Sequence, residues 1–184
     1  MEAVERKIDR RIIKTRRAIN QAFADLILTN EIDDITITMI TEEADIGRKT
    51  FYLHYFDKYD LLDQVIDEYL NRLGARCDNL KLSGFQDTTL EWFAFLDEHH
   101  ALFKRLFESK GSNSFRNKFL AFTIEQLKKK EELLAVKEGY DFKLHFLGYA
   151  VTGIVEEYVL KDLSAEQTSI AQELSDLVKK NLVW

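Results

Sequence analysis

The chain has 184 residues but no proline and only seven glycines. Proline interrupts helices more strongly than any other residue, so its absence removes a common cause of short or kinked helices. Apolar residues recur at helical spacing through most of the sequence, and no segment shows the clear alternation of a half-buried strand. With 46% apolar residues, the chain can also bury packed cores. These features predict an all-α fold.

Cysteine is scarce too. Cys77 is the only one, which excludes an internal disulfide and a cysteine-based zinc site. We interpret it as a small buried apolar residue, and a reducing cytoplasm fits this usage. The first residues include Glu2, Glu5 and Asp9 and form no apolar run. We therefore expect neither a secretory signal nor a membrane span, and we expect a cytoplasmic protein.

Motifs that carry catalytic chemistry are also missing. The sequence contains no Gly-rich phosphate loop and no nucleophile elbow. His99 and His100 are adjacent and lie about 100° apart on a helix, so they do not form the i, i+4 pair that one metal ion needs. We interpret them as a surface pair. We expect no enzyme, no metal site and no cofactor.

The most informative segment, residues 36–62, reads as a helix, a turn, a second helix and the start of a third. Apolar residues at helical spacing follow Thr36, whose hydroxyl can cap the first helix. Asp45 stands where the chain reverses, and Asp tolerates the left-handed conformation better than most residues. Gly47 can then cap the second helix. The turn is therefore only about three residues long.

The second helix has two different sides. Phe51 and Tyr55 are four residues apart and share the side that we expect to be buried. The other side carries Arg48, Lys49, Tyr52 and Leu53. Cationic, hydroxylic and apolar side chains suit phosphate oxygens, base edges and thymine methyl groups. The alternative is an ordinary helical corner with a solvated polar side, because this geometry also occurs in proteins that do not bind DNA.

The same segment closely resembles the DNA-binding domain of the TetR family of transcriptional regulators. The resemblance is carried by Ile37, Ile40, Ala44, Ile46, Arg48, Thr50, Phe51, Tyr52, His54, Tyr55, Phe56 and Lys58. It covers residues 15–70 with specific motifs and continues more faintly through the helical remainder. Asp45 stands where the family usually has Gly, Gly47 where Ser is common, and Lys49 where a small residue is frequent. These departures concern the operator sequence and leave the fold unaffected.

The resemblance implies a regulator, most often a ligand-responsive repressor, that binds a palindromic operator of double-stranded DNA as a homodimer. The residues that it places in the groove are Arg48, Lys49, Thr50, Tyr52 and Leu53. Those that it places on phosphates are Thr38, His54 and Lys58. The competing class is a helical interaction protein that keeps this fold but regulates through a protein partner without DNA affinity.

Charge is unevenly distributed along an acidic chain of net charge −6. The first 24 residues contain seven cations against three carboxylates. The cations are Arg6, Lys7, Arg10, Arg11, Lys14, Arg16 and Arg17. Next to a DNA-reading helix this segment suits phosphate contact, although it also suits a solvated arm. We interpret the second basic cluster, residues 128–130, as a solvated helix face.

The pattern predicts about nine helices. The first runs over residues 12–28 and the fourth over 58–73, long enough to belong to two domains. Two helices follow within 87–109, and a long one ends near residue 136 after a break at 111–113. A helix over 141–160 can be capped by Asp141, and Ser164 with Gln167 forms a capping box that opens the last helix. We divide the chain into a helix-turn-helix domain, residues 1–60, and an effector-binding and dimerisation domain, residues 61–184.

The middle of the chain is rich in aromatic residues, which either form an ordinary core or line a cavity for an apolar effector. The expected pocket residues are Trp92, Phe119, Phe122, Gln126, His145, Phe146 and Tyr149.

The last two helices carry long apolar stripes. Gly148 and Gly153 in the first of them each cost about 1 kcal/mol relative to Ala, which a close helix crossing would justify. TetR-family members dimerise through these helices, so the resemblance implies an isologous four-helix interface. Its expected residues are Val151, Ile154, Tyr158, Ile170, Leu174, Leu177 and Val178. The alternative is that both stripes belong to the core of their own domain.

Overall fold

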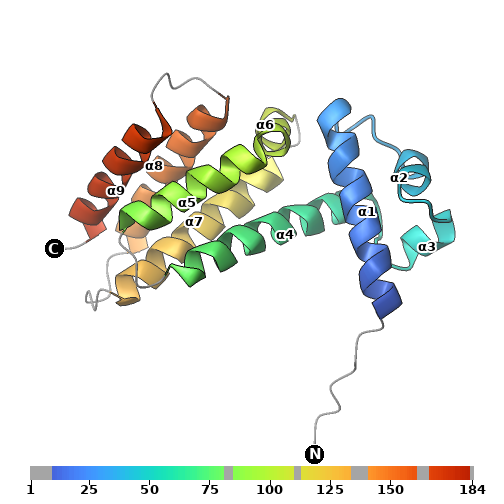
Figure 1. The fold of residues 1–184 in the computed structure, drawn as a ribbon, viewed down its shortest axis with the longest axis horizontal. Coiled ribbons are helices and arrows are strands. Elements are labelled where there is room, and N and C mark those ends of the chain that lie inside the picture. The colour runs from blue at the N-terminus through green and yellow to red at the C-terminus, as the bar shows by residue number, and fades with distance from the viewer. Residues whose placement is uncertain (1–9, 81–84, 110–112, 134–140, 161–165, 183–184) are drawn as a thin grey trace, which may run out of the picture. The chain divides into compact units, whose positions relative to one another are not determined.

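The computed structural model describes residues 10–80, 85–109, 113–133, 141–160 and 166–182. Within these residues the protein has nine α-helices and no strand, which confirms the all-α prediction (Figure 1). They are α1 (Arg10–Thr29), α2 (Ile37–Glu43), α3 (Arg48–Tyr52), α4 (Lys58–Asn79), α5 (Phe85–Glu98), α6 (His100–Glu108), α7 (Asn113–Leu133), α8 (Asp141–Leu160) and α9 (Gln167–Leu182). No helix in this part of the chain is long and apolar enough to cross a membrane. The capping roles expected of Asp141 and Ser164 lie outside what the structure describes.

The chain forms two compact units, Met1–Val65 and Ile66–Trp184, so the division falls within α4. In the first unit, α1 buries the apolar stripe that its sequence predicts, including Phe23 and Ile27. Residues from the next helices complete this core, with Ile40 of α2 and Leu61 of α4 fully buried. This small core positions α2 and α3.

α4 begins with a reciprocal cap. The Asp57 carboxylate accepts hydrogen bonds from the backbone N–H groups of Tyr59 (2.8 Å) and Asp60 (2.9 Å). The Asp60 carboxylate in turn accepts one from the backbone N–H of Phe56 at 2.8 Å. This exchange satisfies orphan donors at the helix start and fixes the short connection from α3 to α4.

α4 also ends six residues later than predicted, because Gly74 continues the helix instead of ending it. A Cβ atom on Gly74 would lie 3.3 Å from the Phe122 ring of α7. The glycine therefore serves close packing between α4 and α7 in the second unit.

The second unit has a core dominated by phenylalanine. Phe93, Phe95, Phe103, Phe115 and Phe119 are all buried. Several rings meet edge to face, such as Phe95 and Phe103 with centroids 6.0 Å apart, an arrangement that aromatic quadrupoles favour. Packing pairs α5 with α9 and α7 with α8.

The crossing of α7 and α8 explains one of the two helical glycines. A Cβ atom on Gly148 would lie 2.6 Å from Cγ1 of Ile124, so only glycine allows this approach. The close crossing predicted for Gly148 is confirmed. Arg116 ties the same helices together, because its Nε donates to both carboxylate oxygens of Glu156 at 3.1 and 3.2 Å. Gly153 has nothing within 4 Å of an added Cβ among the described residues.

Candidate nucleic-acid interface

The turn between α2 and α3 has the predicted local geometry. The Thr36 hydroxyl caps α2 by accepting a hydrogen bond from the backbone N–H of Met39 at 3.2 Å. Asp45 is left-handed, with φ of 51°, the only described non-glycine residue with a positive φ. The backbone N–H of Ile46 then donates to the Thr41 carbonyl at 3.0 Å and closes the corner. Gly47 is the N-cap of α3, but its φ is −79°, so its backbone does not require glycine.

α3 is held by one side and exposes the other. Phe51 and Tyr55 are buried in the first unit, with ring centroids 5.6 Å apart. The Tyr55 hydroxyl donates to the side-chain oxygen of Asn20 on α1. The exposed side consists of Arg48, Lys49, Tyr52 and Leu53, with Thr50 half-buried. Four of the five residues expected in the groove are therefore exposed.

The three residues expected on phosphates differ in their surroundings. Thr38 is exposed and His54 is half-buried. Lys58 donates instead to the backbone carbonyls of Ile32 (3.1 Å), Asp33 and Ile35 (2.9 Å). An ammonium has only three N–H donors, so this set of bonds occupies all of them. The structure assigns Lys58 to holding the loop between α1 and α2, and we remove it from the phosphate contacts.

Phe56 is an accessible residue whose exposure the sequence pattern did not reveal. Its side chain is 85% exposed, next to Leu53 at 80%. Its backbone N–H donates to the Asp60 carboxylate, which holds this part of the backbone just after the exposed side of α3. An alternating or helical pattern could not show this, because Phe56 lies in the short connection between two helices.

α1 supplies positive charge in the same unit. Arg10, Arg11, Lys14, Arg16 and Arg17 are all exposed, whereas Arg6 and Lys7 lie outside the described residues. Arg16 donates to the side-chain oxygen of Gln64, and its guanidinium lies 5.9 Å from the centre of the Tyr55 ring. The basic character of α1 is therefore available at the surface, and such a surface suits a phosphate backbone.

Residues 84–180, more than half of the chain, match the family described as the transcriptional regulator C-terminal region. The protein belongs to the TetR family of transcriptional regulators. An uncharacterised helix-turn-helix regulator of Bacillus subtilis, YxbF, is 43% identical over 63 residues, which are 34% of this chain and 17% of that protein. DhaS of Lactococcus lactis, named as the transcriptional activator of the dhaKLM operon, is 30% identical over 95 residues, 52% of this chain and 50% of that protein. The matches thus span half or less of these curated relatives.

Solved structures show the same fold. The dihydroxyacetone kinase operon activator DhaS superposes with a TM-score of 0.73 at 24% identity, covering 92% of this chain and 97% of that one. A TetR-family regulator of Syntrophomonas wolfei superposes with a TM-score of 0.71 at 14% identity, covering 92% and 95%. At these identities the likeness establishes a TetR-like fold and carries no ligand or operator from one protein to another.

The second unit of this TetR-family protein contains a pocket, but its lining differs from the predicted set. Trp92 and Gln126 line it as expected. Phe119 is fully buried in the core, and Phe122 packs against the Trp92 ring with centroids 5.4 Å apart. Neither residue lines the pocket.

The remaining expected pocket residues point the other way. His145, Phe146 and Tyr149 are exposed, with Phe146 at 61% and Tyr149 at 65%. Their side of α8 lies opposite the side that packs on α7, as Leu144 and Leu147 are buried. These three residues therefore do not line this pocket, and α8 is apolar on both sides.

Most residues expected at a dimer interface instead belong to the core of their own unit. Those buried within one chain are Val151, Ile170, Leu174 and Val178. Val151, Leu174 and Val178 even line the pocket. Tyr158 is half-buried, and its hydroxyl donates to the Asp97 carboxylate at 2.8 Å. Ile154 is also half-buried, and only Leu177, at 59%, is exposed.

Two further interpretations are corrected in this unit. The residues 128–130 are not uniformly solvated, since Lys130 is half-buried and lines the pocket. His99 and His100 are not a surface pair. Burial lowers the pKa of His99, whose ring packs 4.6 Å from that of Phe95. His100 makes a 2.8 Å hydrogen bond with the Val159 carbonyl.

Cys77 is buried, as predicted, and the Trp92 indole N–H donates to its sulfur at 3.0 Å. Burial raises the pKa of the Cys77 thiol to about 11. A thiol of this kind is a poor nucleophile at neutral pH.

Proposed function

We propose that the protein is a ligand-responsive transcriptional repressor that binds a palindromic operator as a homodimer. The observation that carries this proposal is the two-sided α3. Phe51 and Tyr55 anchor the helix while Arg48, Lys49, Tyr52 and Leu53 remain accessible on its other side. A helix presented in this way fits the major groove, where these side chains read base edges and methyl groups.

The phosphate contacts come from different elements. Exposed Thr38 of α2 and half-buried His54 after α3 flank the reading helix in sequence. The exposed cations of α1 add charge that is attracted to any DNA sequence. Phe56 adds an exposed apolar side chain near Leu53, where it suits a thymine methyl group or a sugar face. A regulator of this kind acts in the cytoplasm of a bacterium, where the DNA lies.

The proposed dimer uses the exposed side of α8. Phe142, Phe146, Tyr149 and Gly153 follow each other at intervals of four, three and four residues and so form one stripe. The three aromatic side chains are 77%, 61% and 65% exposed. Gly153 has no described neighbour within 4 Å of an added Cβ, so a second helix can approach the backbone there. Leu177 of α9 adds a further exposed apolar side chain.

Binding to DNA is tested with fragments selected by the purified protein from random sequence and then measured by mobility shift. Replacing Tyr52 or Lys49 with Ala should remove a contact of about 1–3 kcal/mol and weaken operator binding about 5- to 150-fold. Both side chains are exposed, so helical content should not change. Lys104→Ala is the matched control, because Lys104 lies on α6 of the other unit and pairs with Glu108. Unchanged affinity in both α3 variants would refute the assignment.

The competing function, regulation through a protein partner, predicts that the pure protein binds no DNA at either of two salt concentrations. A DNA-binding protein should instead lose affinity steeply as salt rises, since each phosphate contact releases counterions. The direction of regulation is read from a reporter gene. DhaS is named as an activator, so higher expression with the protein than without it would overturn repression while leaving DNA binding intact.

A further inference from the structure

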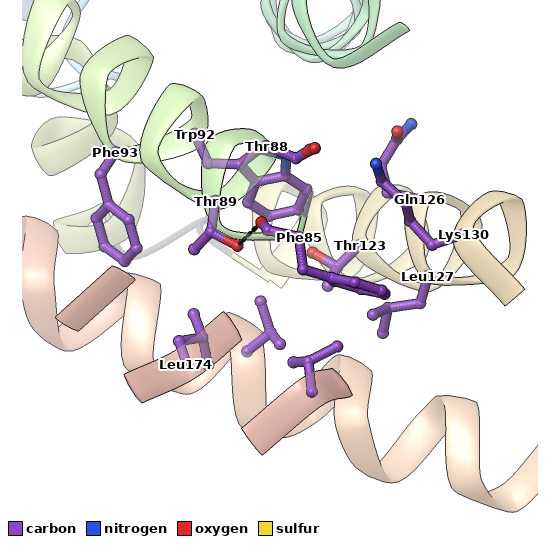
Figure 2. A pocket seen from close by; sticks show the side chains of 12 residues that line it. Phe85, Thr88, Thr89, Trp92, Phe93, Thr123, Gln126, Leu127, Lys130 and Leu174 are labelled. Carbon is purple, nitrogen blue, oxygen red and sulfur yellow. Dashed lines mark hydrogen bonds between the residues drawn. The ribbon is translucent and has the colours of Figure 1, made fainter. Parts of the chain in front are cut away.

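The pocket of the second unit is built by α5, α7, α8 and α9 (Figure 2). Its lining residues on α5 span two helical turns from Phe85 to Phe93, about 12 Å. Three apolar side chains of α8 and α9 line the other side, namely Val151, Leu174 and Val178. In Figure 2, Phe93 and Leu174 lie toward one end and Gln126 and Lys130 toward the other. The pocket is therefore apolar along most of its length and polar at one end.

The hydrogen bonds already made in this pocket limit what its polar groups can offer. The Thr89 hydroxyl donates to the Phe85 carbonyl at 2.8 Å, and the Thr123 hydroxyl donates to the Phe119 carbonyl at 2.9 Å. Each of these hydroxyls has used its only proton. The Gln126 amide and the Lys130 ammonium, four residues apart on the same side of α7, can donate to a ligand. The polar end thus suits a ligand with a strong acceptor.

Lys130 indicates that the ligand carries a negative charge. It is half-buried, and its ammonium lies 5.8 Å from the centre of the Phe85 ring. Burial lowers its pKa, and no carboxylate among the described residues forms an ion pair with it. Its neighbour Lys129, by contrast, pairs with Glu125 at 3.1 Å. A partly desolvated cation with no ion-pair partner in the described part of the chain is unfavourable, and a bound anion would stabilise it.

Size limits the ligand further. The cavity volume is about 70 Å³. This corresponds to roughly five water-sized positions, which suits a small organic molecule. We propose that the pocket binds a small monocarboxylic acid, with its apolar body between Phe93 and Leu174 and its carboxylate on Lys130 and Gln126. This inference rests on the proposed function, because it names the chemical class of the effector.

The test compares acids with amides of the same shape. Hexanoate and benzoate are titrated into the full-length protein by calorimetry, in parallel with hexanamide and benzamide. At least one acid should bind with a Kd at least about tenfold lower than its amide, because a charge-assisted hydrogen bond is the stronger kind. Equal affinity of acids and amides, or no binding of either acid, would overturn the proposal. This comparison uses the unaltered protein and needs no variant to fold.

Lys130→Met then tests the residue. It should weaken acid binding about 10- to 150-fold and leave amide binding unchanged. Lys129→Met is the matched control and should bind the acids like the unaltered protein, since Lys129 does not line the pocket. Equal acid affinity in the Lys130 and Lys129 variants would also overturn the assignment. None of these measurements includes DNA. Acid binding can therefore be absent while operator binding is present, and operator binding can be absent while acid binding is present.

Discussion

Replacing Phe146 with Glu should separate the two protomers of the proposed dimer without unfolding either one. Phe146 is 61% exposed in the single chain, so the fold should lose less than about 0.5 kcal/mol. In an isologous dimer the residue is buried twice. Fully burying one Phe contributes about 1.5–3 kcal/mol, so the exposed fraction of two copies corresponds to about 2–4 kcal/mol. The dimer Kd should therefore rise about 30- to 700-fold, before any repulsion between the two new carboxylates is counted.

The measurement is sedimentation equilibrium over a range of concentrations, combined with thermal unfolding followed by circular dichroism. Phe56→Glu is the matched control, because it makes the same change at an exposed Phe of the other unit and should leave the dimer intact. Leu174→Glu is the contrasting variant. Leu174 is buried and lines the pocket, so its replacement should destabilise the fold by about 3 kcal/mol or more.

Either of two results would refute this reasoning. If Phe146→Glu leaves the dimer Kd unchanged, the exposed stripe of α8 is not the interface. If Leu174→Glu instead yields a folded monomer, the interface includes the side of α9 that we assign to the core. Operator affinity should fall together with the dimer, since one protomer occupies only one half-site.

Three further predictions concern stability. Asp45→Gly should raise the free energy of unfolding by up to about 1 kcal/mol, because Asp45 is left-handed and exposed, and a lower Tm in this variant would contradict the argument. Burial and the hydrogen bond to Asp97 raise the pKa of Tyr158 from 10.0 to about 12. This contribution to stability is therefore present below pH 10 and lost as the pH rises toward 12, and Tyr158→Phe should flatten that alkaline loss in a pH series of urea unfolding curves. Cys77 should react with iodoacetamide at pH 8 far more slowly in the folded protein than in urea, and equal rates would show that the thiol is accessible.

The helix-turn-helix was predictable because its determinants are local. A hydroxyl before α2, a residue that tolerates positive φ and an apolar pair four residues apart are all visible within 20 residues of sequence. The structure shows Thr36 as the cap, Asp45 at a φ of 51° and Phe51 with Tyr55 in the core. Helix ends were less predictable, since α4 passes Gly74, where Phe122 of a distant helix packs closely.

Lys58 shows where local resemblance fails. The family resemblance implied a phosphate contact, but its ammonium bonds to carbonyls 23 to 26 residues earlier in the chain. The prediction for Lys130 had the opposite error. Its place in a run of lysines suggested a solvated face, whereas its ammonium lies 5.8 Å from the centre of the Phe85 ring and interacts electrostatically with Cys77. In both cases the partners are distant in sequence, and spacing along one helix carries no information about them.

α8 explains why the two predicted sets of residues are reversed, with most expected pocket residues of α8 exposed and Val151, expected at an interface, lining the pocket. A helix on the surface of a single chain normally has one apolar stripe and one polar side. α8 has two apolar stripes, Leu144 to Val155 on one side and Phe142 to Gly153 on the other. Sequence alone cannot decide which stripe faces the core, since both have helical spacing. The structure decides it through Gly148, which lets only one side approach α7. The other stripe is left exposed with three aromatic side chains, and a second copy of the chain would remove that surface from water.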